Sequence, residues 1–122
     1  MTVLELYKTA LNVMYEKPNS KVYENYYKTH INLLLAELFD LNNTIRKRKG
    51  EEELTEIPFI EKDEDEIKYE SIVLREILPW GLAARFCIDD DLNKFSIYNT
   101  NFMNACFKYE RAVVVEVEDV YG

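Results

Sequence analysis

The stretch from residue 70 to residue 111 limits the fold more than any other part of the chain. It holds two apolar segments with helical spacing, joined by the acidic corner Asp89-Asp90-Asp91. Aspartate at such a corner caps the following helix, and carboxylates in a first turn oppose the positive end of the helix dipole. The pattern predicts a helical hairpin. Adjacent side chains point in different directions, so capping is preferred here to a metal site.

Both arms of the predicted hairpin have an apolar side. The first arm contains Pro79, which lacks a backbone N–H and clashes with the preceding turn, so we expect the helix to kink or restart there. Trp80 then provides a core anchor, and the small residues that follow it allow another helix to approach closely. In the second arm the apolar side is formed by Phe95, Tyr98, Phe102, Cys106 and Tyr109.

Two helices are predicted before the hairpin. Thr2 and Glu5 have the spacing of a capping box, and apolar residues follow at helical steps as far as Met14. After Pro18, a long second helix is expected from about Tyr23 to Arg48, which is roughly 39 Å at 1.5 Å per residue.

A basic run, Arg46-Lys47-Arg48-Lys49, ends this second helix and is followed by Gly50. Cations there oppose the negative end of the helix dipole, and glycine favours the left-handed cap conformation. The alternative is a patch that contacts DNA or an acidic neighbour. Neither interleaved aromatic residues nor a nucleic-acid motif accompanies the run, so capping is the preferred interpretation.

The segment 51–66 is the most acidic part of the chain, with nine carboxylates in sixteen residues. It is interpreted as a solvated connecting loop whose apolar residues, Leu54 and 57–60, anchor it as a short strand. Pro58 would confine such a strand to a sheet edge. Residues 63–66 lack the alternating ligands and the glycine of a calcium loop.

After Arg111 the apolar period changes from helical to two. This alternation predicts a short β-strand or an extended tail over residues 112–122. The strand would pair either within the chain or with another subunit or protein by β-augmentation, and the sequence leaves both open. The residues assigned to such a partner or subunit interface are Val113, Val115, Val117, Asp119 and Tyr121.

The predicted fold is a single, mainly α domain over residues 1–122, a compact bundle of about four helices. The second helix is long, the third is kinked by proline, and the loop at 51–66 and the tail at 112–122 lie outside the helices. The 122 residues suit one domain. Three Gly and three Pro leave little material for a turn-rich β-fold.

Charge and side-chain chemistry narrow the function. A net charge of −8 disfavours generic binding to nucleic acid or anionic lipid and suits either a basic partner or a need for solubility. His30 is the only histidine, and no ligand or nucleophile stands at a spacing that would make it a metal ligand or general base. Cys87 and Cys106 fall within helical patterns, which favours core thiols in a reduced compartment over a disulfide. We therefore predict no catalytic residue, cofactor or metal.

No segment has the character of a membrane span. The longest apolar run, residues 31–39, is interrupted by Asn32 and Glu37 and is far shorter than the ~20 residues required. Glu5 interrupts the first apolar segment, which is not typical of a signal peptide. We expect the protein to stay where it is made.

The second half of the chain resembles the small helical head-tail connector proteins of tailed phages and prophages. The resemblance rests on the order of an acidic stretch, Leu78-Pro79-Trp80-Gly81-Leu82-Ala83-Ala84, Asp89-Asp90-Asp91, Tyr109-Glu110-Arg111 and Val117-Glu118-Asp119-Val120-Tyr121-Gly122. It covers mainly residues 57–122. The basic run has no counterpart, and the first half matches only as helices of suitable length.

The resemblance implies an all-α head-completion or neck adaptor with a minor β element. Such an adaptor forms a ring of its own subunits on the portal, extends the DNA channel and contacts a further neck or tail protein. It would be found in the bacterial cytoplasm during assembly and later in the virion neck. Subunit and portal contacts would fall on residues 113–121. The alternative is an acidic interaction module, either a DNA mimic or an inhibitor of a basic partner. An enzyme using carboxylates is the weakest hypothesis.

Overall fold

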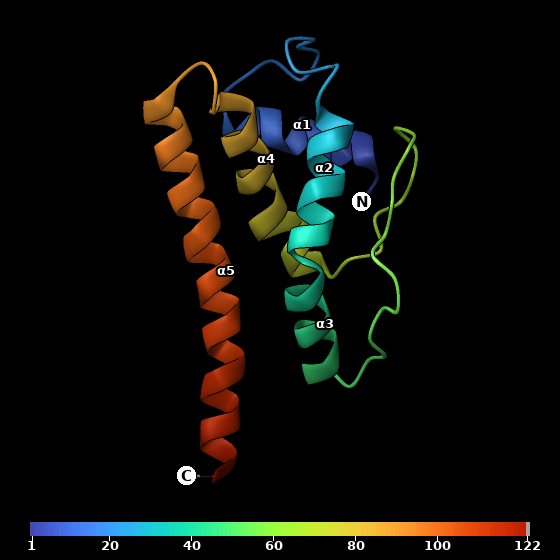
Figure 1. Ribbon diagram of the computed structural model, residues 1–122, viewed down its shortest axis with the longest axis vertical. Helices are drawn as coiled ribbons and strands as arrows, with labels where there is room; N and C mark the ends of the chain where they lie inside the picture. Colours follow the sequence, from blue (N-terminus) through green and yellow to red (C-terminus); the bar gives the residue numbers. More distant parts are fainter. Residues whose placement is uncertain (122) are drawn as a thin grey trace.

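The computed structural model describes the backbone of residues 1–121 and the side chains of residues 1–110. Within this range the chain forms five α-helices and no strand (Figure 1). The helices are α1 (Val3–Val13), α2 (Tyr27–Glu37), α3 (Phe39–Arg48), α4 (Leu78–Cys87) and α5 (Leu92–Tyr121). The predicted mainly α class is confirmed, with five helices instead of about four.

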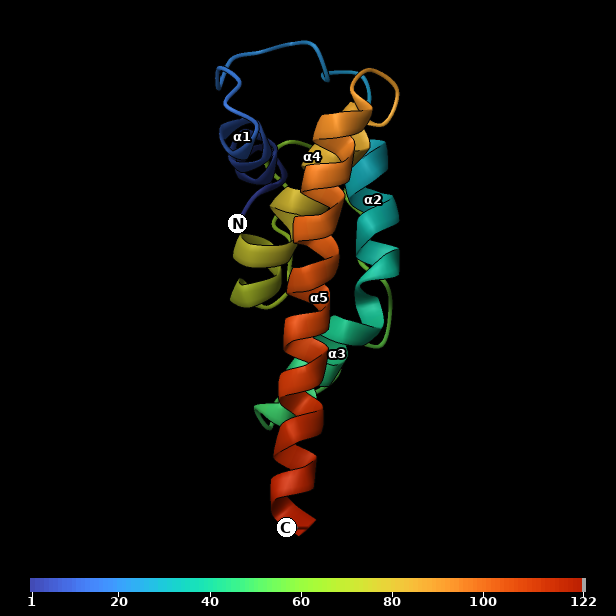
Figure 2. The same cartoon turned by 90° about the vertical axis from the view of Figure 1, so that its left-hand side faces the viewer.

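Helix α4 lies at the centre of the domain and packs against α1, α2 and α5. Figures 1 and 2 show α5 along one side of α4, with α1 crossing near one end. Gly81 of α4 lies in close contact with side chains of both α5 and α2. A Cβ atom there would lie 2.8 Å from Cε1 of Phe102 and 3.0 Å from Cδ2 of Leu34. The close helix approach predicted from small residues is confirmed, as is the hairpin of α4 and α5.

The expected irregularity at Pro79 is a π-helical turn, Val73–Ile77, immediately before α4. The amide of Leu78 donates to the carbonyl of Val73, five residues back, and Pro79 lies in the first turn of α4. This wider turn accommodates the proline ring, which would clash with a carbonyl in a continuous α-helix. The predicted kink or restart is therefore confirmed.

The prediction of one long second helix from Tyr23 to Arg48 is wrong. Turns precede α2, and the helix is broken at Leu38, which separates α2 from α3. The carbonyl of Leu35 accepts a hydrogen bond from the hydroxyl of Tyr69. A side chain inserted into the helical hydrogen-bond ladder bends or breaks the helix at that point. This tertiary contact is not visible in the local sequence.

Two predicted helix caps are confirmed. The Thr2 hydroxyl accepts the Glu5 amide at 3.1 Å, and the Glu5 carboxylate accepts the Thr2 amide at 3.2 Å. At the end of α3, Gly50 has φ of 78°, and the amide of Glu51 donates to the carbonyl of Arg46 at 2.9 Å. Together with the Gly50 amide bond to Lys47, this is a Schellman cap.

The acidic segment 51–66 is confirmed as an irregular connection, but the short strand expected at residues 57–60 is absent. Two helical asparagines hold the segment in place of a strand partner. Asn32 donates to the carbonyl of Ile60 at 3.0 Å and accepts its amide at 2.9 Å. Asn43 makes the same pair of bonds with Leu54, at 3.0 and 2.8 Å. A side-chain amide thus replaces the backbone of a neighbouring strand.

The prediction of a C-terminal β-strand or extended tail at residues 112–122 is wrong for the described backbone, because α5 continues to Tyr121. Extending an existing helix adds one hydrogen bond per residue without a new nucleation cost. Each valine lowers helix propensity by only about 0.5 kcal/mol. A strand would instead need a partner, and no other strand exists among residues 1–121.

Candidate interaction site

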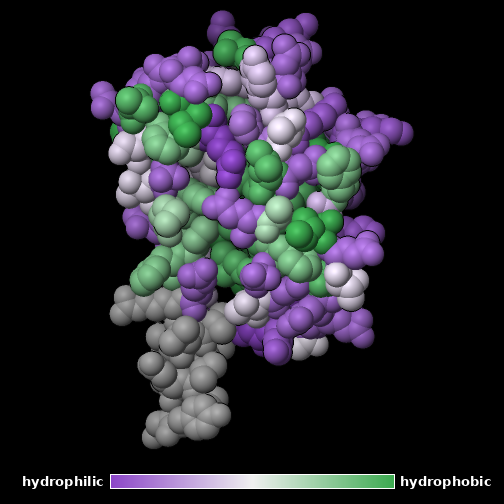
Figure 3. Space-filling view, in the orientation of Figure 1, coloured by the Kyte–Doolittle hydropathy of each residue, from purple (hydrophilic) through white to green (hydrophobic). Residues whose placement is uncertain are grey.

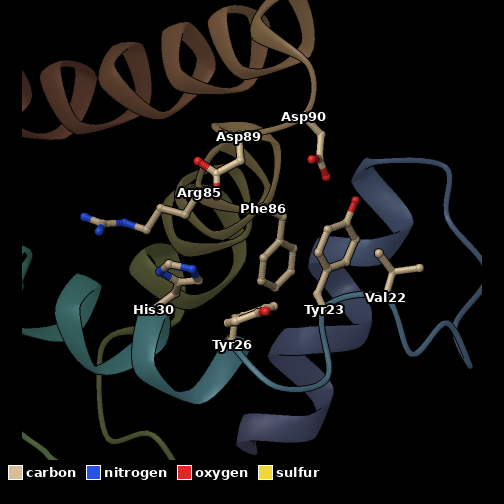
Figure 4. Close-up of a pocket in the computed structure, with 8 residues that line it drawn as sticks. All are labelled: Val22, Tyr23, Tyr26, His30, Arg85, Phe86, Asp89 and Asp90. Atoms are coloured by element: carbon tan, nitrogen blue, oxygen red, sulfur yellow. The ribbon is translucent and has the colours of Figure 1, made fainter.

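A cavity of about 410 Å³ opens at the end of the bundle where the chain enters α2 and leaves α4. Figure 4 shows the side chains that line it. They are Val22, Tyr23, Tyr26, His30, Arg85, Phe86, Asp89 and Asp90. The site combines aromatic rings, two carboxylates, one guanidinium and one imidazole. Among these residues, a functional role is weighed from the sequence only for His30 and for the corner aspartates, and in both cases the structural interpretation is preferred.

Stacked aromatic rings form a firm wall of the cavity. Phe86 stacks on Tyr23 with ring centroids 4.3 Å apart and an interplanar angle of 5°. Phe86 also makes edge contacts with His30 at 6.1 Å and with Tyr7 at 6.0 Å, and Tyr7 stacks on Tyr27 at 4.2 Å. Contacts of this kind fix ring orientation beyond the gain from burial alone. The cavity is therefore preformed.

The two basic groups at the cavity carry little free positive charge. Figure 4 shows the guanidinium of Arg85 turned away from the rings, and it donates to the carboxylate of Glu37 at 2.6 Å, which offsets its charge. Burial lowers the pKa of His30, and the nearby Arg85 lowers it further, against a smaller opposing effect of Asp89. A lowered pKa favours the neutral imidazole at pH 7. His30 is half-buried, and its Nδ1 atom has no hydrogen-bond partner.

The three corner aspartates have different roles. Asp91 accepts the amide of Lys94 at 3.1 Å and caps α5, so the capping interpretation is confirmed for this residue. Asp89 and Asp90 are exposed and line the cavity instead. Neither has a hydrogen-bond or ion-pair partner among the side chains that the structure describes. In Figure 4 the Asp90 carboxylate is turned toward the hydroxyl of Tyr23.

The pKa of Tyr23 is raised by its position in the cavity. Burial is the main cause that raises the pKa of Tyr23 to about 12, and the negative charges of Glu16 and Asp90 contribute. The phenol is therefore protonated throughout the neutral range and available as a hydrogen-bond donor. The cavity has the chemistry of a binding site, with rings on one wall and unpartnered carboxylates at the rim.

The basic run at the end of α3 does not form an open cationic patch, because its cations contact acidic side chains. Lys49 Nζ lies 3.0 Å from the buried carboxylate of Glu70 and 3.3 Å from that of Glu51. Arg46 lies 3.6 Å from each of these carboxylates. The hydrogen bond to Glu70 is the main cause that raises the pKa of Lys49. Arg46 and Lys49 therefore contact acidic neighbours within their own chain, in addition to standing at the end of α3 where the capping interpretation placed them.

The cysteines are free thiols, as predicted. Cys87 is buried, and burial raises the pKa of the partly buried Cys106 to about 11, so neither is an activated thiolate. Among the described side chains, no three His, Cys, Asp or Glu residues converge as a metal ion would require.

The five residues assigned to a partner interface, Val113, Val115, Val117, Asp119 and Tyr121, lie outside the described side chains. Their backbone belongs to α5. Residues spaced by two share a face on a strand but not on a helix, so the period-two grouping no longer joins them on one surface.

Sequence reasoning missed most of the cavity and both clamping asparagines. The sequence contains one signal for the cavity and one for the asparagines. Asp89 and Asp90 are two more aspartates than a helix cap needs, and Asn32 interrupts an otherwise apolar run. Tyr23, which shares the cavity with these aspartates, and Ile60, whose backbone Asn32 binds, are remote in sequence and could not be predicted from spacing.

Comparison with known proteins gives no identification. No protein-family model matches the chain, and neither do curated proteins or solved structures. Across the described residues, no helix has the length and apolar character needed to cross a bilayer.

Proposed function

We propose that the protein is a structural component of a phage or prophage virion, a head-tail connector adaptor that forms a ring on the portal and extends the DNA channel. The observation that carries the proposal is the hairpin of α4 and α5. It is built from the same stretch on which the sequence resemblance rests, and it is the structural centre of the domain. Helix α5 is 30 residues long and continues past the end of α3 (Figure 1).

A rigid hairpin suits a protein that must hold its shape within a ring. At Gly81 the helices touch so closely that a single methyl group would meet Phe102 and Leu34. Further along α5, the hydroxyl of Tyr109 donates to the carboxylate of Glu76, within the π-helical turn. These contacts fix α5 along much of its described side-chain length. A fixed helix offers neighbouring subunits a stable surface.

The charge distribution is compatible with a channel that passes DNA without gripping it. The net charge is −8, and Arg46, Lys47 and Lys49 contact carboxylates of the chain itself. An acidic surface repels phosphate, so DNA meets no attractive field along the wall. We therefore propose no sequence-specific contact with nucleic acid.

The contacts between subunits and with the portal are assigned to the last turns of α5. Because the backbone there is helical, we propose helix packing in place of β-augmentation as the means of joining. Of the five residues assigned from the sequence, Val113, Val117 and Tyr121 are spaced by four and so fall on one helical face, whereas Val115 and Asp119 fall on another. A further neck or tail protein completes the partners, with assembly in the bacterial cytoplasm and a final place in the virion neck.

The second candidate is an acidic module that captures a basic partner, and the unpartnered Asp89 and Asp90 favour it. The acidic segment does not, because five of its nine carboxylates bind groups of the chain itself. They are Glu51, Glu53, Asp63, Asp65 and Glu66. A DNA mimic needs its carboxylates free, which makes the ring adaptor the better supported function.

The mass of the purified protein by light scattering, over a concentration series, tests the proposal. The full chain and a variant lacking residues 112–122 are compared, alone and mixed with the portal protein encoded in the same genome. A closed oligomer, or a complex with the portal, that is lost on truncation is the expected result. A chain that neither self-associates nor binds the portal contradicts the adaptor function.

A further inference from the structure

We propose that the cavity lined by Tyr23, Tyr26, Phe86, Asp89 and Asp90 is a receptor for an arginine side chain presented by a partner protein. Nothing in this inference depends on ring assembly, since it concerns the opposite end of the molecule from the last turns of α5 (Figures 1 and 2). It names a second docking surface and the chemistry of the group that it takes.

The charge of the cavity selects a cation. Asp89 and Asp90 contribute two carboxylates, and no described side chain pairs with them. Arg85 is bound to Glu37 at 2.6 Å, so its charge is already balanced. With a neutral His30, the cavity has an excess of two negative charges. A guanidinium entering from a partner would make charge-assisted hydrogen bonds with these carboxylates, and such bonds are about twice as strong as neutral ones.

The rings select a planar cation with an apolar stem. Tyr26 is 59% exposed at the mouth, and the Tyr23–Phe86 stack forms the wall behind it. Guanidinium groups stack on aromatic faces and fork between carboxylates, whereas the ammonium of lysine is a compact and strongly hydrated point charge. The volume of about 410 Å³ is within the range of roughly 300–1,000 Å³ typical of ligand pockets.

The surface around the cavity has the features of a protein interface. The connection from α1 to α2 and the corner between α4 and α5 lie at the same end of the bundle (Figure 1), and both carry exposed apolar side chains. They are Tyr15, Val22, Tyr26, Ile88 and Leu92. Figure 3 shows apolar side chains over the start of α5, at the upper left of that view. Aromatic anchors around a pocket are typical of binding hot spots.

Tyr15 is the most unusual residue of this surface. It is 97% exposed and has φ of 61°, in the left-handed region that glycine normally occupies at a helix end. The amide of Glu16 donates to the carbonyl of Leu11 at 2.9 Å, so the strained residue completes a Schellman cap. An aromatic residue held there costs conformational energy without burying its ring in the chain. Contact with a partner would bury that ring.

The test uses the full-length protein and the tripeptide acetyl-Gly-Arg-Gly-amide, followed by two-dimensional ¹H–¹⁵N NMR. The expected result is saturable shifts confined to residues 22–30 and 85–90, with a dissociation constant on the order of millimolar for so small a ligand. The citrulline tripeptide, which has the same shape without the charge, is expected to bind at least about tenfold more weakly. The lysine tripeptide is expected to bind more weakly than the arginine one.

Variants separate a built site from general attraction to an acidic protein. The D89N/D90N variant is expected to lose at least about tenfold in affinity, and Tyr26→Ala about two- to fivefold. The matched control E61Q/E64Q also removes two negative charges, but from exposed positions of the acidic segment. It is expected to bind the arginine tripeptide as tightly as the parent protein does. Equal losses in both double variants, shifts spread over the whole acidic surface, or equal binding of lysine and arginine would overturn the proposal.

Discussion

Two acidic segments of this chain look alike in the sequence and are used in opposite ways. In the segment 51–66, five of the nine carboxylates bind groups of the chain itself. Asp65 accepts the amides of Glu61 and Lys62, each at 2.9 Å, and Asp63 accepts the hydroxyl of Tyr27 and lies 3.4 Å from Lys28. At the corner between α4 and α5, only Asp91 is used in this way. Asp89 and Asp90 are left to the cavity.

The difference lies in what reaches each carboxylate. The segment 51–66 lies along the helices (Figure 1), and backbone amides, a phenol and lysines are close to its acidic side chains. The corner lies at the end of the bundle, where one cap satisfies the start of α5 and the two remaining carboxylates face solvent. Acidic residues can therefore hold a segment against its own chain in one place and be free to bind a partner in another. Only the groups packed around the carboxylates distinguish the two cases.

The largest loss of stability is expected from replacing Asn32 and Asn43, the two asparagines that hold the acidic segment by side-chain hydrogen bonds. In the variant N32A/N43A, four hydrogen bonds to Leu54 and Ile60 are lost and backbone groups of a partly buried connection are left without partners. We expect the free energy of unfolding, from urea denaturation, to fall by about 2–5 kcal/mol. Amide hydrogen exchange at Leu54 and Ile60 should accelerate.

The control for this variant is Asn104→Ala, an exposed position on α5. Its effect should lie within about 0.5 kcal/mol. A clamp variant as stable as the parent would show that charge, and not the two asparagines, holds the acidic segment in place.

A smaller loss is expected from Glu70→Gln, at the end of the acidic connection. The carboxylate of Glu70 is buried and lies 3.0 Å from Lys49 and 3.6 Å from Arg46. The backbone amide of Glu70 donates to the side-chain oxygen of Asn42 at 2.8 Å. Glutamine keeps the shape but removes the charge, so we expect a loss of about 1–3 kcal/mol in urea denaturation. Glu64→Gln, an exposed neighbour, serves as the control. An unchanged stability would mean that desolvation of Glu70 cancels its ion pairs.

Acid should release the segment 51–66 through Asp65. Hydrogen bonds from the amides of Glu61 and Lys62 lower the pKa of Asp65 below its ordinary value of 3.8. A carboxylate with a lowered pKa contributes stability that is present above the ordinary pKa and is lost as the pH falls toward the folded value. Asp65→Asn should therefore flatten the dependence of unfolding free energy on pH below about 4. An unchanged slope would assign the acid sensitivity to other carboxylates.

These contacts also explain how far the sequence alone could predict the structure. Local signals worked: the capping box at Thr2, the glycine cap at Gly50, the irregularity at Pro79 and the aromatic side of α5 all depend on residues a few positions apart. The break at Leu38 depends on Tyr69, and the cavity joins Tyr23 with Phe86. Such pairs are fixed by tertiary packing, which a periodic pattern does not encode.

The smallest effect on stability is expected at the corner, and it would sharpen the contrast most. Because Asp89 and Asp90 are exposed and have no described partner, the D89N/D90N variant should unfold within about 0.5 kcal/mol of the parent. Asp91→Ala, one residue further, should lose about 1 kcal/mol with the cap of α5. Urea denaturation of both variants measures this directly. If D89N/D90N were the less stable of the two, its carboxylates would be holding the fold together, as those of the segment 51–66 do, and would not be free for a partner.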